Sequence, residues 1–218
     1  MKLATFLNLT FAFLNSNLYA QNGIPVKMIE YWYQGKAELT RYELHQGRYG
    51  EIHTGNAILI FVTEDFLIDK QVKHEYGSEL SQSVLKLNFI RNFTTGIYAY
   101  SLMTSIFTPV NPAHTHSLKI SSSAQDWCGQ TYLQLNFKKN KFEGIFRSYF
   151  QLEGDKNFTL ESSLLEDELW TRIRLAPELL PVGEINLIPS AQYLRFVQEP
   201  ISIKTASAKL SEITNLEL

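Results

Sequence analysis

The sequence predicts a mainly β protein, built as a curved, open, barrel-like antiparallel sheet that packs on one helix. Apolar and polar residues alternate in short runs, as where Leu85, Leu87 and Phe89 are separated by Lys86 and Asn88. This period of two places the two sets on opposite faces of a strand. The runs follow one another with short connections, which favours antiparallel pairing because parallel strands need crossovers of a dozen or more residues. We therefore expect the strands to form a meander.

The expected strands cover most of the chain. Residues 57–62 form a continuous apolar run, typical of a central strand with both faces covered. Residues 133–137 repeat the alternation of residues 85–89. Further strands are expected at residues 39–45, 97–107, 117–123, 142–152, 185–188, 193–197 and 201–205. Turns between them are indicated by Gly47, Gly50, Gly77, residues 109–112, Asn140 and residues 154–155.

One helix is expected at about residues 160–174. Apolar residues recur there at helical spacing, and Pro177 and Pro181 prevent its continuation. The acidic run Glu166, Asp167 and Glu168 is expected to form the solvated face of this helix. The apolar positions are Leu160, Leu164, Leu165, Leu169 and Ile173.

Residues 1–20 predict a cleaved secretory signal peptide. Lys2 supplies a short basic region, residues 3–14 are mostly apolar, and residues 17–20 end in a small residue suited to cleavage. The apolar run is shorter than the about 20 residues that a membrane-spanning helix needs. We therefore expect a periplasmic or secreted protein that is not an integral membrane protein. A buried N-terminal strand or helix is the alternative.

The mature chain, residues 21–218, is expected to be a single β-rich domain that stops inside or just after a further strand, as if truncated at the C-terminus. Its hydrophobic content of 44% is enough for a sizeable core. Loss of Lys2 leaves 19 basic and 22 acidic residues, a net charge of −3. This balance gives no reason to expect nucleic acid as a partner. Cys128 is the only cysteine, so the fold has no internal disulfide.

Two histidines form the strongest metal signal. His114 and His116 share a face if they lie on a strand, and two imidazoles on one face can bind one zinc ion. A third ligand would have to come from His53, His74 or a carboxylate. Two exposed loop histidines are the commoner outcome, so no metal or other cofactor is expected.

Three other groups could carry chemistry. Cys128 follows Asp126 and Trp127 but lacks the flanking signatures of a catalytic cysteine, and a small buried apolar residue is the alternative. Glu51 and His53 share a strand face and could act as an acid and a base, or form a surface salt link. Glu64 and Asp65 are adjacent and so diverge in direction. No catalytic residue is assigned.

Aromatic residues suggest a binding function. They gather at residues 31–33 and again in one hairpin, as Phe142, Phe146, Tyr149 and Phe150. Most are expected in the core. A large twisted sheet that one helix cannot cover often leaves an apolar concavity, which is a default ligand site.

Several segments resemble a known family: residues 31–38, 48–51, 60–64, 125–129 and 168–171. They resemble exported proteins of Gram-negative bacteria without an assigned function, sometimes labelled septum formation inhibitor Maf. The resemblance covers about residues 31–190 and implies a location in the cell envelope. The Maf nucleotide pyrophosphatases open on Ser-x-Ser-Pro-Arg-Arg, which has no counterpart here, so that activity is not expected. The expected architecture is also similar to that of periplasmic lipoprotein carriers, whose curved sheet wraps a helix and holds lipid.

Three functions remain open at this point. The first is a non-enzymatic envelope protein that binds a lipid, another apolar ligand or an envelope protein. The second is a secreted hydrolase that uses Glu51, His53 or the pair His114 and His116, with or without zinc. The third is a structural envelope component without a small ligand.

Overall fold

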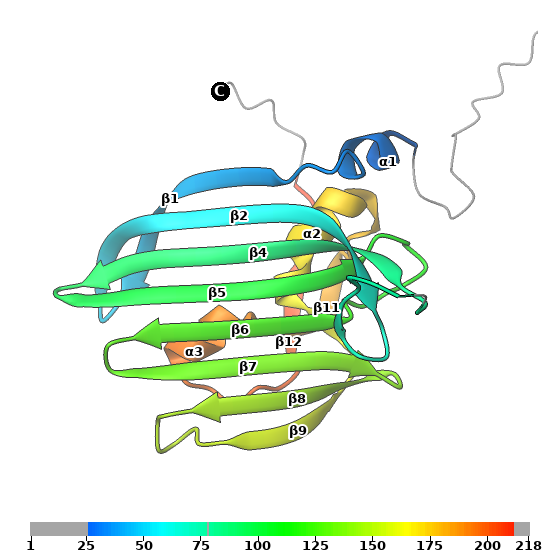
Figure 1. Cartoon of the computed structure of the whole chain (residues 1–218). Coiled ribbons are helices and arrows are strands. Elements are labelled where there is room, and N and C mark those ends of the chain that lie inside the picture. Colours follow the sequence, from blue (N-terminus) through cyan, green and yellow to red (C-terminus); the bar gives the residue numbers. More distant parts are fainter. Residues whose placement is uncertain (1–25, 78, 212–218) are drawn as a thin grey trace, which may run out of the picture.

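The computed structural model describes residues 26–77 and 79–211 and shows a mainly β protein (Figure 1). Its main sheet has nine strands, in the order β1-β2-β4-β5-β6-β7-β8-β9, with β3 paired to β2. Every pairing in this sheet is antiparallel. The expected meander and the open curved sheet are thus confirmed. The predicted signal peptide at residues 1–20 and the final residues 212–218 lie outside the described residues.

The main-sheet strands are long, and most match the runs in which apolar and polar residues alternate. They are β1 (Glu38–Arg48), β2 (Glu51–Leu67), β3 (Val72–Lys73), β4 (Gln82–Thr95), β5 (Tyr98–Pro109), β6 (Lys119–Asp126), β7 (Gly129–Lys138), β8 (Lys141–Ser148) and β9 (Lys156–Glu161). Gly50 and Asn140 lie in tight turns with positive φ, as expected, whereas Gly47 lies inside β1.

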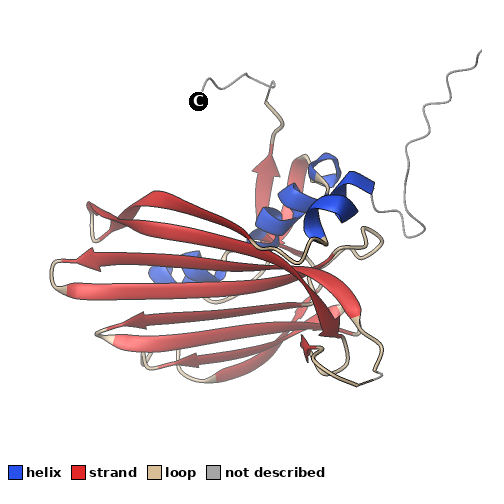
Figure 2. Ribbon diagram, turned by 45° about the horizontal axis from the view of Figure 1, so that its top comes forward, coloured by secondary structure: helices blue, strands red, loops and turns tan. Residues whose placement is uncertain are grey.

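A second layer covers the concave face of the main sheet. It contains the short helices α2 (Leu169–Leu175) and α3 (Ala191–Val197) and a small sheet. In that sheet β11 (Gly183–Ile188) lies between β10 (Leu164–Leu165) and β12 (Lys204–Ala208). Figures 1 and 2 show these elements on one side of the main sheet. A helix preceding the sheet, α1 (Val26–Trp32), was not expected from the sequence.

The main core lies between these two layers. Large side chains of the concave face, including Phe61, Leu85 and Leu87, are almost completely buried. Leu165 and Ile188 of the second layer pack into the same cluster. In the run at residues 57–62, alternate residues are buried and the others are half-buried on the convex face. The expected full cover of both faces is therefore only partial.

The helix expected at residues 160–174 is much shorter. Leu160 lies in β9, Leu164 and Leu165 form β10, and residues 166–168 form a 3₁₀ turn before α2 begins at Leu169. The strand expected at residues 193–197 is instead helix α3. Both errors have one cause, because a short apolar run fits either period and long-range packing selects between them.

Gly55 is required by the close approach of β2 and β4. A Cβ at Gly55 would lie 2.1 Å from the carbonyl oxygen of Asn92 and 2.7 Å from Cβ of Phe93. Gly47, in the same hairpin, has open space, since its nearest neighbour would be Cδ1 of Ile52 at 3.9 Å. Substitution of Gly47 is therefore a matched control for substitution of Gly55.

We predict that Gly55→Ala lowers the free energy of unfolding by about 1 to 3 kcal/mol, because the backbone of β4 must shift to admit the methyl group. Gly47→Ala should leave it unchanged or slightly raised, since glycine weakens a strand interior. Urea denaturation followed by far-ultraviolet circular dichroism measures both. Equal stability of the two variants would contradict the described register.

Candidate functional site

A cavity of about 210 Å³ lies between α3 and strands β5 to β9 on the concave face. Its walls are mostly apolar, and side chains from the sheet and from α3 both contribute. The apolar lining includes Leu102, Ala124, Leu133, Phe146, Phe158 and Leu194. A partly open concave space with such walls is the usual form of a site for an apolar ligand.

The strand pattern explains where this cavity forms. On β6 and β7 the concave positions hold small residues, Ser122, Ala124 and Thr131. Under α2, by contrast, large residues fill the space between the layers. On β8, Gly144 makes room for the ring of Phe158, which lines the cavity, because a Cβ there would lie 2.3 Å from that ring. Small side chains below α3 therefore leave room that the second layer does not fill.

One buried amide forms a polar spot in this apolar lining. Gln192 of α3 is 1% exposed, and its Nε2 donates to the carbonyl oxygen of Phe89 (3.2 Å) and to Oγ1 of Thr104 (3.1 Å). Thr104 is bonded in turn to Ser122 across β5 and β6 (2.9 Å). These bonds tie the middle of α3 to the sheet and leave Oε1 of Gln192 without a partner among the described residues.

Two carboxylates hold the N-terminus of α3. Oε2 of Glu166 accepts the backbone N–H of Ser190, and Oδ2 of Asp167 accepts that of Ala191, both at 2.8 Å. Asp167 is fully enclosed, and this burial raises the pKa of its carboxyl group above 3.8. The acceptor oxygens of both side chains are stabilising there because they satisfy N–H groups that a helix leaves free at its N-terminus.

The third acid of this run connects α2 to the main sheet. Glu168 is 0% exposed, and its Oε2 accepts the backbone N–H of Ser117 at 2.6 Å. Its Oε1 accepts the N–H of Leu165 at 3.1 Å, and Arg172 donates to Oε2 at 3.2 Å. The solvated acidic face expected for residues 166–168 is therefore wrong, because Asp167 and Glu168 are internal and bonded to backbone donors.

The C-terminal half of α3 is held by two arginines. Arg195 pairs with Asp126 at 2.8 Å, and both side chains are nearly buried. The Arg195 guanidinium also lies 4.5 Å from the ring centre of Phe150. Arg48, from β1, donates to the carbonyl oxygen of Phe196 at 2.7 Å. The helix that closes the cavity is thus fixed at both ends.

The residues of the zinc hypothesis do not come together. His114 is exposed, whereas His116 is half-buried against Phe137, with ring centres 5.0 Å apart. Burial lowers the pKa of His116. Nε2 of His53 bonds to the carbonyl oxygen of Arg48 (3.1 Å) in a separate part of the sheet. Within residues 26–77 and 79–211, no group of three His, Cys, Asp or Glu side chains could hold a metal ion.

The other candidates for chemistry are also separated. Cys128 is exposed in the β6–β7 turn and is not the small buried apolar residue considered above. Asp126 accepts the N–H groups of Cys128 and Gly129, each at 2.9 Å, so its role there is to close the turn. Among the described ion pairs, none joins Glu51 to His53.

The aromatic groups divide between core, cavity and surface. Trp32 is buried near Phe61, whereas its neighbours Tyr31 and Tyr33 are exposed. In the second group, Phe142 is buried and Phe146 lines the cavity.

Glu64, from the adjacent acidic pair Glu64 and Asp65, forms an ion pair with Lys86 at 3.2 Å.

Sequence reasoning missed the part of the cavity that α3 provides. Ala191, Gln192, Leu194 and Arg195 belong to a segment expected to be largely a strand. Their spacing after Ser190, a residue type favoured at helix starts, is the signal that could have found the helix.

Comparison of the chain with protein-family models, with curated proteins and with solved structures found no significant match. Among the residues that the structure describes, no helix is both long and apolar enough to cross a membrane.

We predict that Asp167→Ala lowers the free energy of unfolding by about 2 kcal/mol, because it leaves the buried N–H of Ala191 without an acceptor. Asp69→Ala, an exposed acid remote from α3, should have little effect. Chemical denaturation at pH 7 compares the two. A loss no larger than that of Asp69→Ala would contradict the role given to Asp167.

Because the pKa of Asp167 is raised in the folded protein, the free energy of unfolding depends on pH. The folded protein holds this proton more tightly than the unfolded chain, so the contribution of Asp167 to stability is largest below pH 3.8. It declines as the pH rises through the raised pKa. Asp167→Asn keeps an acceptor oxygen and should lack this decline. If the free energies of unfolding of the wild type and Asp167→Asn change with pH in parallel, the raised pKa of Asp167 is contradicted.

Proposed function

We propose that this protein binds an apolar ligand, in the form of a single acyl chain, in the cavity beneath α3. The observation that carries the proposal is the cavity itself, with its apolar walls and a roof fixed at both ends. Its volume of about 210 Å³ exceeds the about 150 Å³ at which a dry apolar cavity can bind benzene. It is below the about 300 Å³ at which sites for drug-sized ligands begin. One chain therefore fits better than a whole diacyl lipid.

One cation at the cavity favours an anionic head group. Arg195 pairs with Asp126, Glu199 lies 3.3 Å from Lys204, and Glu153 accepts a hydrogen bond from Ser148. Lys156 also lines the cavity, is exposed, and forms no ion pair among the described residues. An ammonium group beside an apolar cavity suits a carboxylate at the end of an acyl chain.

The proposed place of action is the cell envelope, and this rests on the sequence alone. The signal peptide expected at residues 1–20 and the resemblance to exported proteins both support it. For the hydrolase alternative, the described residues contain no group of three side chains that could hold a metal ion, and Glu51 and His53 form no ion pair there. The structural alternative leaves the cavity without a use.

We predict that the protein binds a fluorescent fatty-acid probe in its cavity and that decanoate displaces the probe from the same site. Ala124→Trp should abolish probe binding because the indole fills the cavity between β6 and α3. Ser123→Trp is the matched control, since the adjacent residue of a strand faces the opposite side and Ser123 does not line this cavity.

Fluorescence titration of the three proteins measures the dissociation constants, with circular dichroism to confirm that each is folded. Binding that survives in folded Ala124→Trp, or that is lost equally in Ser123→Trp, would contradict the proposed location. Absence of any probe binding by the wild type would contradict the function.

We further predict that Lys156→Gln weakens decanoate binding about two- to five-fold, the range expected for an exposed ion pair, and leaves decanol binding unchanged. Lys139→Gln, in the β7–β8 turn, is the matched control for loss of one positive charge. Isothermal titration calorimetry with decanoate and decanol separates the contribution of the carboxylate from that of the acyl chain. An equal change for acid and alcohol would exclude a head-group contact at Lys156.

A further inference from the structure

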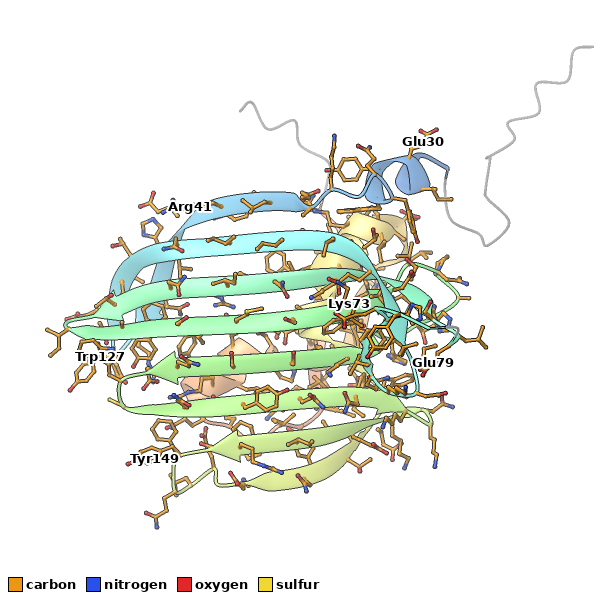
Figure 3. The ribbon with its side chains drawn as sticks, in the orientation of Figure 1. Glu30, Arg41, Lys73, Glu79, Trp127 and Tyr149 are labelled. Atoms are coloured by element: carbon orange, nitrogen blue, oxygen red, sulfur yellow. The ribbon has the colours of Figure 1, made fainter. Side chains whose placement is uncertain are left out.

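One end of the main sheet carries a row of exposed apolar residues. The meander brings the β1–β2, β4–β5, β6–β7 and β8–β9 connections to this end, where Figure 3 labels Trp127 and Tyr149. Every one of these connections presents at least one large apolar side chain to solvent. We call the set the aromatic rim: Tyr49, Ile97, Tyr98, Trp127, Tyr149 and Leu152, which are between 43% and 92% exposed.

Contacts between neighbouring turns make this rim continuous. The rings of Tyr98 and Trp127 are 6.0 Å apart, which joins the β4–β5 and β6–β7 turns. A Cβ added to Gly129 would lie 3.0 Å from the ring of Tyr149, so the β6–β7 and β8–β9 turns are also in contact. The hydroxyl of Tyr49 is 3.1 Å from that of Tyr100, which links the β1–β2 turn to β5.

The opposite end of the sheet has a different chemistry. The β2–β4 connection at this end also exposes apolar residues, Ile68, Val72, Tyr76 and Leu80, but these lie among charged side chains. Figure 3 labels Lys73 and Glu79 at this end. The charged residues of the connections at this end are Asp69, Lys70, Lys73, Glu75, Glu79, Lys138, Lys139 and Lys141. The exposed apolar residues of this end are therefore interspersed with charged ones, whereas ring contacts join those of the rim.

We propose that the aromatic rim docks on the surface of a lipid bilayer. Tyrosine and tryptophan favour the boundary between head groups and acyl chains because each has an apolar body and a polar tip. Side chains at the tips of these turns can enter that boundary, where no matching protein surface is needed. The charges near the rim are of both signs, namely half-buried Arg48 and exposed Glu51, Asp155 and Lys156, so docking should not require anionic lipid.

The rim is continuous with the cavity. Leu152 belongs to the rim and also lines the cavity, and Phe150 lies against Arg195, another lining residue. Docking would therefore place the cavity beside the acyl layer, from which a single chain could enter it. This link to ligand exchange rests on the proposed function, whereas the docking itself does not.

Sedimentation with vesicles tests the docking directly. We expect the wild-type chain to bind vesicles of phosphatidylcholine alone, with similar affinity when phosphatidylglycerol is added. The double variant Trp127→Ser/Tyr149→Ser should bind at least ten times more weakly, because it removes two interfacial anchors. The matched control Tyr76→Ser/Leu80→Ser removes two exposed apolar residues from the opposite end and should bind like the wild type.

Cys128 supplies an independent measurement, because it is the only cysteine, is exposed and follows Trp127. An environment-sensitive fluorophore on its thiol should shift its emission to the blue when phosphatidylcholine vesicles are added. The same label on the rim variant should shift much less.

Four results would overturn docking through the rim: no binding to vesicles, binding only to anionic vesicles that salt reverses, equal loss in the control, or self-association without lipid that the rim substitutions abolish. Decanoate affinity in solution separates this proposal from the proposed function. It should be the same in the rim variant, since Trp127 and Tyr149 do not line the cavity.

Discussion

The packing of the second layer over the cavity depends on the buried ion pair and hydrogen bonds that hold one seven-residue helix, α3. A helix so short is unstable alone, because nucleation costs more than a few backbone bonds return. Glu166 and Asp167 bind its first N–H groups, and Arg195 reaches the buried carboxylate of Asp126. Burying such charges is costly unless each is bonded, so loss of one partner would leave an uncompensated group inside the protein. These contacts fix the roof of the cavity.

The cavity follows from this fixed roof together with the sizes of the residues beneath it. Below α2, residues such as Phe61 and Phe89 fill the core. Below α3, Ser122, Ala124 and Thr131 leave a space that rigid backbone contacts prevent from collapsing. The cavity and the aromatic rim share Leu152, so the proposed acyl-chain site and the proposed membrane-docking surface adjoin at one end of the strands.

The sequence predicts the main sheet well and the second layer poorly, for a physical reason. Strands such as β4 and β7 alternate over many residues, and their partners are adjacent in the chain, so local pattern is sufficient. Asp167 is different, because its partner Ala191 lies 24 residues further along. A run of acidic residues indicates a solvated face unless the distant backbone N–H groups that bond to it are known. An apolar concavity was expected, but its walls could not be located, since they depend on the volume left between two layers.

The central claim is that the cavity holds one acyl chain, and native mass spectrometry tests it most directly. The full chain, expressed with residues 1–20 in place and purified without detergent, should carry a single fatty-acid-sized adduct, or accept one decanoate per molecule when purified empty. Folded Ala124→Trp should carry none. A wild-type protein that shows only its own mass after incubation with decanoate, or an adduct retained in equal amount by Ala124→Trp, would contradict the account.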